Sequence, residues 1–110
     1  MFRNVHLGRI TRLLHPKLVV LVVAKDGEKV NAMTAAWCMP VSVDPPLVVV
    51  SISPKRYTYK LIKREKEFTI NVMPLDKMRE AHICGTVSGT RVDKIKKTGL
   101  RLLKSAKITT

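Results

Sequence analysis

The chain has 110 residues, 45% hydrophobic and 26% charged, a composition that predicts one globular domain. Its 21 lysines and arginines outnumber 8 acidic residues, which gives a formal net charge of +13. No apolar stretch approaches the roughly 18–20 residues that span a bilayer, and the N-terminus lacks a signal-peptide pattern, so we expect a cytoplasmic protein without a membrane partner.

The first predicted strands form a hairpin. Residues 18–23 are a continuous β-branched and aliphatic run, typical of a strand that is buried on both faces. Asp26 and Gly27 follow, and this pair favours a tight turn because glycine accepts the positive φ that such turns need. Residues 29–33 then return as the second strand.

A second hairpin is predicted around a proline pair. Residues 37–43 form a third candidate strand, which ends at Asp44-Pro45-Pro46 because neither proline can donate to a β-ladder. Residues 47–53 are the most β-prone segment and form the fourth strand. In this strand Ser51 and Ser53 share one face.

After Pro54 the pattern changes to that of a helix over residues 57–67, with Thr58 as a candidate cap. Residues 68–73 alternate with period two and predict a fifth strand, with Phe68, Ile70 and Val72 on one face.

The C-terminal part predicts two short helices. Pro74 begins one of them, a stripe of apolar residues at helical spacing follows, and Gly85 is the expected stop. Residues 92–97 predict the other, which ends at Gly99, and residues 100–103 could begin a further strand. Hairpin-connected strands with peripheral helices indicate a mainly β fold, an antiparallel barrel rather than a Rossmann sheet.

The basic charge is unevenly distributed: residues 30–54 contain no lysine or arginine, whereas 55–66 and 91–107 are rich in both. Such a charge suits an anionic partner, which could be nucleic acid, a membrane surface or a phosphorylated cofactor, or it is a solvated surface without a partner. The five aromatic residues are too few for the stacking platform of a single-strand nucleic-acid binder.

The two cysteines, Cys38 and Cys84, have neither metal-ligand spacing nor a secretory context, so we expect no disulfide between them. His82 and Cys84 could begin a metal site, but no further ligands lie nearby in the sequence, and we expect no metal.

Residues 31–58 are the most informative part of the chain. Small and hydroxylated residues are followed by Arg56, Tyr57 and Thr58, and hydroxyls, backbone amides and an arginine at strand ends are groups that hold a phosphate. No catalytic triad or acid pair accompanies them. Chemistry at such a site would therefore come from a bound cofactor.

These motifs resemble, in order and spacing, the flavin reductase-like family of FMN-binding split β-barrels, and its flavoredoxin-like subset. They are N-x-M-T-A-A-W at 31–37, S-V-D-P-P-L-V-V-V-S-I at 42–52, R-Y-T at 56–58, F-T-I-N-V at 68–72 and A-H-I-C-G-T-V-S-G-x-x-V-D-K at 81–94. The resemblance covers nearly the whole chain as one domain over residues 1–110. Members of the family usually continue for several more strands, so the barrel is expected to be incomplete.

The resemblance implies a set of cofactor-binding residues: Asn31, Met33, Thr34 and Ala35 against the flavin ring and its ribityl chain, Ser51, Ser53, Arg56 and Thr58 around the phosphate, and Ser88, Gly89 and Lys94 near the flavin edge. The alternatives are an ordinary polar loop at 31–35, a helix cap beside a surface arginine at 53–58, and a solvated helix start at 93–94. Arg91 is expected to lie outside the phosphate cluster. Trp37 is expected in the core rather than facing a ligand.

The resemblance thus implies an FMN-binding flavoprotein, an NAD(P)H-dependent flavin reductase or a related electron-transfer oxidoreductase, with no catalytic side chain because the flavin carries the chemistry. A non-enzymatic FMN carrier and, less favoured, a small basic nucleic-acid-binding protein are the alternatives. We also expect a homodimer that buries the neutral 30–54 region and keeps the basic helices outside.

Overall fold

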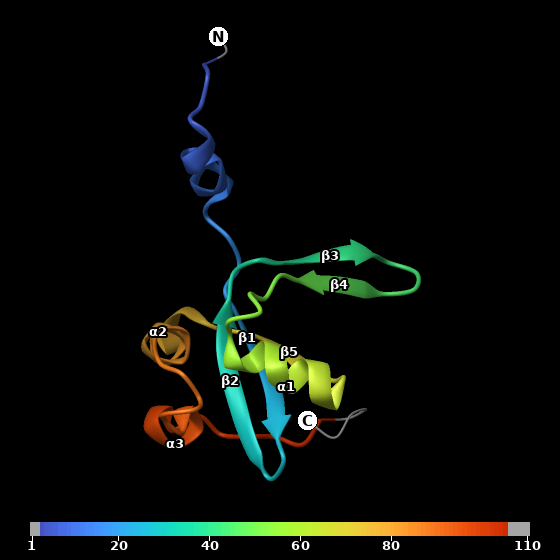
Figure 1. Ribbon diagram of the computed structural model, residues 1–110, viewed down its shortest axis with the longest axis vertical. Coiled ribbons are helices and arrows are strands. Elements are labelled where there is room, and N and C mark those ends of the chain that lie inside the picture. The colour runs from blue at the N-terminus through green and yellow to red at the C-terminus, as the bar shows by residue number, and fades with distance from the viewer. Residues whose placement is uncertain (1–2, 106–110) are drawn as a thin grey trace.

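The computed structural model describes residues 3–105 and is mainly β with helices at its periphery (Figure 1). In chain order its elements are η1 (Leu7–Leu14), β1 (Val20–Asp26), β2 (Lys29–Ala35), β3 (Cys38–Ser42), β4 (Leu47–Val50), α1 (Tyr57–Glu65), β5 (Thr69–Val72), η2 (Leu75–Lys77), α2 (Met78–Thr86) and α3 (Lys94–Thr98). All five strands that the sequence predicts are present. They form two separate antiparallel sheets that do not close into a barrel within the described residues.

The main sheet has the strand order β2-β1-β5. Strands β1 and β2 form the predicted hairpin, with Asp26 opposite Lys29, and Gly27 in the turn has a φ of 61°. Strand β1 is buried on both faces, as its sequence predicts: Val20 and Val22 are at most 1% exposed on one face, and Leu21 is 4% exposed on the other.

Helices cover both faces of this sheet (Figure 1). On one face, Val20, Val22, Met33 and Ala35 form a cluster against which Ile62 of α1 packs. On the other face, Leu21, Ala32 and Cys84 of α2 form a second cluster, together with Ile95 of α3. The end of β2 therefore lies between α1 and the α2–α3 segment, and this is where the candidate site forms.

Strands β3 and β4 form a separate hairpin that extends away from the main sheet (Figure 1). Because no second layer covers most of the hairpin, its apolar side chains are exposed, among them Met39, Val41, Val48 and Val49. The expectation that Trp37 lies in the core is wrong for the same reason: its side chain is 54% exposed at the base of the hairpin, with the Lys17 ammonium 5.1 Å from the ring centre.

Several predicted boundaries differ from the structure. Strand β4 ends at Val50, so Ser51 and Ser53 lie beyond it rather than on one face of a strand. Strand β2 continues to Ala35 rather than ending at Met33. Helix α2 passes through Gly85 and ends at Thr86, so the predicted stop is wrong.

The C-terminal predictions had mixed outcomes. Gly99 follows α3 with a φ of 70°, as its role as a helix stop requires. No strand forms over residues 100–103, although Leu100 still packs against the second core cluster. The stripe predicted on α2 is buried only in part: Ala81 and Cys84 are buried, whereas Leu75 and Met78 are exposed, because no element covers the start of that segment.

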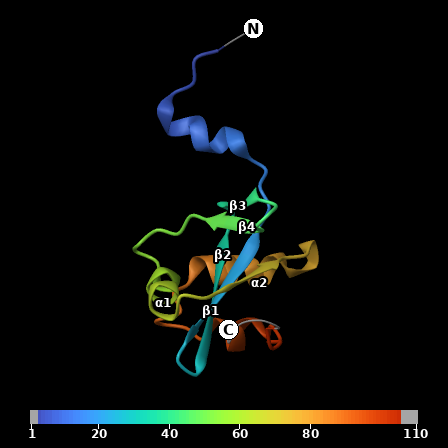
Figure 2. The ribbon, with the colours of Figure 1, turned by 90° about the vertical axis from the view of Figure 1, so that its right-hand side faces the viewer.

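The N-terminal segment projects from the body of the molecule, as Figures 1 and 2 show from two directions. Its 3-10 helix η1 buries no residue, and Leu7, Ile10, Leu13 and Leu14 are all exposed. Over residues 3–105, no helix has the length and apolar character needed to cross a bilayer.

Candidate functional site

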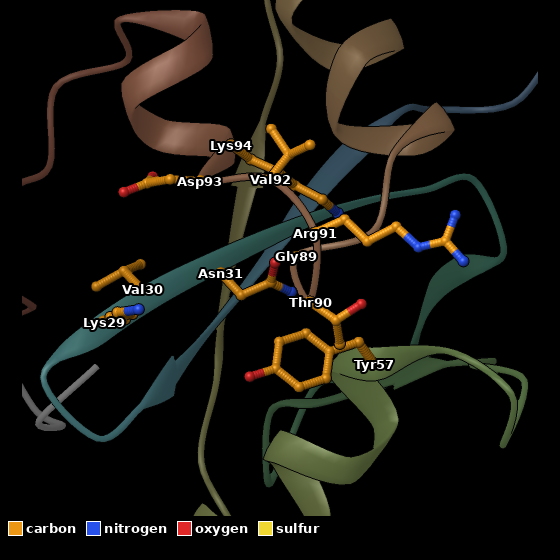
Figure 3. Close-up of a pocket in the computed structure, with 10 residues that line it drawn as sticks. All are labelled: Lys29, Val30, Asn31, Tyr57, Gly89, Thr90, Arg91, Val92, Asp93 and Lys94. Carbon is orange, nitrogen blue, oxygen red and sulfur yellow. The ribbon is translucent and has the colours of Figure 1, made fainter.

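Three neighbouring hollows lie along β2. The first, called here the cationic hollow, has a volume of about 400 Å³ and lies between the start of α1 and residues 86–94. The second, the strand-end hollow, has about 420 Å³ and extends to the base of the β3–β4 hairpin. The third is a small hollow of about 170 Å³ beside Asn31 and Gly89 (Figure 3). Met33 and Arg56 line both large hollows, and Tyr57, Arg91, Val92 and Lys94 line both the cationic and the small hollow.

The cationic hollow is strongly basic. Lys55, Arg56, Arg91 and Lys94 line it, and no aspartate or glutamate does. Four positive charges around one concave space, without a compensating carboxylate, attract an anion, and an arginine fork suits a phosphate or carboxylate. The sequence did not place Arg91 in this cluster. That expectation is wrong, because the turn at 88–92 brings Arg91 to the same hollow as Arg56.

Arg56 occupies the N-cap position of α1, with extended backbone angles (φ −77°, ψ 140°), and its backbone N–H donates to the Ser53 carbonyl. Arg56 therefore lies at the N-terminal end of α1, where the helix dipole is positive and favours an anion. Thr58 is not the cap, contrary to the sequence-based expectation. It lies in the first turn of α1 and is 1% exposed.

Thr58 is instead bonded to β2. The Asn31 side-chain amide donates a 2.9 Å hydrogen bond to its hydroxyl, and both side chains are buried. The side-chain carbonyl oxygen of Asn31 (Oδ1) has no hydrogen-bond partner within residues 3–105. It lies against Gly89, where an added Cβ would be 2.0 Å from it. Figure 3 shows the Asn31 side chain between Gly89 and the Tyr57 ring. Asn31 thus joins three segments of the site.

The other residues that the resemblance places against the flavin ring also lie in β2. Met33 and Ala35 are each 8% exposed in the first core cluster, and Met33 reaches both large hollows. The Thr34 hydroxyl donates to the Ala81 carbonyl and ties the strand to α2. The alternative of an ordinary polar loop at 31–35 is wrong, since β2 continues to Ala35 and the loop begins at Ala36. Thr34 and Ala35 both line the strand-end hollow.

Ser51 and Ser53 also line the strand-end hollow, and both are exposed. The Ser53 hydroxyl accepts a 3.3 Å bond from the Lys55 backbone N–H. Ser88 lines the cationic hollow, where its hydroxyl is 2.8 Å from that of Thr90 and its carbonyl accepts from Arg91 and Val92. Every sequence-predicted site residue thus lines at least one of the three hollows, but the residues expected around the phosphate are divided between two of them. Ser51 and Ser53 line the strand-end hollow, Thr58 lines the cationic hollow, and Arg56 lines both.

Lys94 differs most from its expected environment. It is 4% exposed rather than part of a solvated helix start, and its ammonium donates to the Ala32 carbonyl at 2.8 Å and to the Cys84 carbonyl at 2.9 Å. Burial lowers the pKa of Lys94, and the nearby Arg56 charge acts in the same direction. Burial raises the pKa of the Cys84 thiol, and the positive charge of Lys94 partly offsets this increase. Asp93 does cap α3, accepting from the Lys96 N–H.

Among the described residues, no three histidine, cysteine or acidic side chains gather as metal ligands, and the thiols of Cys38 and Cys84 are both free. The donor set of the hollows therefore consists of cations, hydroxyls and strand-end amides. Such a set fits an anionic group in the cationic hollow and a flat group in the adjoining strand-end hollow.

Comparisons with known proteins identify the family of the chain. Residues 11–109 match the family described as "Flavin reductase like domain". An uncharacterized protein of Pyrococcus abyssi is 43% identical over 97 residues, covering 88% of this chain and 55% of the relative, and one of Aeropyrum pernix is 35% identical over 103 residues, covering 93% and 39%. The chain thus spans about half the length, or less, of these curated relatives.

Solved structures show the same fold. Flavoredoxin of Desulfovibrio vulgaris (Miyazaki F) superposes with a TM-score of 0.87 at 30% identity, covering 97% of this chain and 58% of that one. An FMN-binding protein from Thermus thermophilus, solved with bound 1-cyclohex-2-enone, gives 0.78 at 32% identity, covering 87% and 54%. The open sheets described above are thus part of a split β-barrel, and the chain belongs to the flavin reductase-like family.

Proposed function

We propose that this chain binds FMN, with the phosphate in the cationic hollow and the ring in the strand-end hollow, and that it works as an NAD(P)H-dependent flavin reductase. One observation carries the proposal: four cations line a hollow that adjoins, through Met33 and Arg56, a second hollow bordered by the end of β2. The family supports flavin binding, and the similar FMN-binding protein of Thermus thermophilus supports FMN in particular.

Each part of the chain has a defined task in this proposal. Arg56 and Arg91 bind the phosphate as charged forks, and the hydroxyl of Ser88 donates to it. The backbone from Thr34 to Ala36 lies where it can donate to the polar edge of a ring, and Trp37 and Ile52 border that hollow. Bound flavin supplies hydride and electron transfer, and these residues orient it and exclude water from one side.

We also propose a homodimer through the β3–β4 hairpin. A two-stranded hairpin is marginally stable alone in water, and this one exposes Met39, Val41, Val48 and Val49 beside the strand-end hollow. The dimer would bury this neutral surface and leave the basic helices outside. Because NAD(P)H is the proposed electron donor, we place the protein in the cytoplasm.

The proposal is tested by titrating the purified protein with FMN and with riboflavin, following the flavin fluorescence. We expect FMN to bind at least about tenfold more tightly, because charge-assisted hydrogen bonds to a phosphate contribute roughly 1.5–3 kcal/mol each. Equal affinities would contradict the phosphate site. Addition of NADH or NADPH without oxygen should then bleach the flavin absorption. FMN binding without bleaching would favour a non-enzymatic FMN carrier.

A further inference from the structure

Lys94 is a buried cation without an acidic partner. Its ammonium lies between the carbonyl oxygens of Ala32 in β2 and Cys84 in α2, at 2.8 and 2.9 Å, and no carboxylate lies within salt-bridge distance of it among residues 3–105. Burying an unpaired charge costs several kcal/mol unless other groups compensate. A position of this kind therefore needs a specific physical reason.

The two carbonyls supply part of that compensation. Cys84 lies in the last turn of α2, where carbonyl groups lack partners within the helix and the helix dipole is negative. Lys94 satisfies one of these carbonyls and, through Ala32, fastens the end of α2 to the central part of β2. It thus acts as a capping cation for a helix other than its own.

This contact also closes a loop. Residues 84 and 94 are joined by the Lys94 ammonium, and the segment 85–93 between them carries Ser88 and Arg91 to the cationic hollow. The middle of the segment is fixed by the contact of Gly89 with the Asn31 side chain. The position of Ser88 and Arg91 therefore depends on a contact that neither residue makes.

We propose that Lys94 is a positioning residue for anion binding: by joining Ala32 and Cys84 it holds the 85–93 segment in the conformation that places Ser88 and Arg91 around the phosphate. This inference rests on the proposed FMN site. Lys94 also adds its own charge to the wall of the hollow. The groups that act on this charge are Cys84 of α2 and Arg56 at the start of α1, Glu80 acts on Cys84, and the neighbouring Asp93 caps α3.

The experiment compares the ratio of FMN to riboflavin affinity in three variants. Lys94→Met removes the ammonium from a buried position, Lys94→Arg keeps a charged donor there, and Lys97→Met removes the same charge from an exposed position on the same helix. We expect the ratio to fall by about tenfold in Lys94→Met, to remain largely intact in Lys94→Arg, and to be unchanged in Lys97→Met. A purely structural role would weaken both ligands equally.

A second measurement needs no variant at position 94, in case Lys94→Met does not fold. In a Lys55→Arg background, Lys94 is the one lysine that lines the cationic hollow. Its lowered pKa means that it loses its proton at a lower pH than an ordinary lysine, and this loss removes a positive charge from the phosphate site. The affinity ratio should therefore fall as the pH rises through that lowered pKa, below the usual 10.5. Ionisation of the flavin ring affects FMN and riboflavin equally, so it does not change the ratio of their affinities.

The outcomes separate the two proposals. If the unmodified protein shows no preference for FMN over riboflavin, the phosphate site itself is wrong. If that preference exists but survives in Lys94→Met, or stays constant to pH 10.5 in the Lys55→Arg protein, only the role of Lys94 is overturned.

Discussion

The side-chain amide of Asn31 donates to the hydroxyl of Thr58 over 2.9 Å, across 27 residues of sequence and in a fully buried setting. This bond joins the middle of β2 to the first turn of α1. Since the cationic hollow lies where these elements meet residues 86–94, the bond sets the spacing of the hollow's walls. Two residues that the sequence motifs suggest as ligand contacts thus also form part of the framework of the site.

Replacing Thr58 by valine should destabilise the protein by about 1–3 kcal/mol, because it leaves the Asn31 amide buried without an acceptor while keeping the side-chain shape. Chemical denaturation monitored by circular dichroism measures the change. Thr11→Val, at an exposed position of η1, is the matched control and should change the stability by less than about 0.5 kcal/mol. Equal stabilities for the two variants would show that the bond contributes little.

The sequence predicted the strands well, because their signals are local. The apolar run of β1, the Asp26-Gly27 turn and the proline pair after β3 each determine their own segment, and each segment is present, although β1 covers Val20–Asp26 rather than residues 18–23. The burial of Trp37 could not be predicted in this way. A tryptophan is usually buried when a second layer covers it, and the local pattern does not reveal that the hairpin stands apart.

The candidate site also shows that local sequence patterns do not reveal contacts between separate elements. Motif order brought Arg56 and Ser88 into the candidate list, and both line the cationic hollow. Arg91 was missed because only the turn after Ser88 brings it back to Arg56. The burial of Lys94 was missed because its partners, Ala32 and Cys84, belong to other elements, and a charged residue at a helix start is normally solvated.

Gly89→Ala should destabilise the protein by about 1–3 kcal/mol and also weaken FMN binding. The added Cβ would lie 2.0 Å from the Asn31 carbonyl oxygen and 3.1 Å from the Tyr57 ring, so the Asn31 side chain must move and strain its bond to Thr58. Thermal unfolding and FMN titration measure the two effects. Gly8→Ala is the control, because its Cβ would meet only the exposed His6 side chain, at 3.3 Å from Nδ1. Unchanged stability in Gly89→Ala would mean that the 85–93 segment moves easily to accommodate the added methyl group.

Arg56→Ala and Arg91→Ala should each weaken FMN by about tenfold, since both guanidinium groups line the cationic hollow, and each tenfold step corresponds to about 1.4 kcal/mol. Riboflavin affinity should change much less in both variants, because riboflavin has no phosphate. Arg79→Ala removes the same charge from an exposed position on α2 and controls for the net charge. If Arg79→Ala weakened FMN as strongly as the other two, a general electrostatic attraction would replace the specific site.

The last prediction concerns the β3–β4 hairpin. Met39 and Val49 are cross-strand partners, 57% and 46% exposed, and burying the exposed half of each side chain in a dimer should contribute roughly 1–1.5 kcal/mol. The double variant Met39→Glu and Val49→Glu should therefore weaken self-association by about a hundredfold or more, as measured by sedimentation velocity over a range of concentrations.

The matched control places two glutamates at Leu75 and Met78, which are 85% and 67% exposed beside α2 and lie outside the proposed interface. Both variants change the net charge equally, so repulsion between the basic surfaces changes equally. A control variant that dissociates as readily as the hairpin variant would move the interface to α2. If the unsubstituted protein is monomeric at tens of micromolar, the dimer is refuted. The apolar surface of the hairpin would then have to be covered by something other than a second copy of the chain.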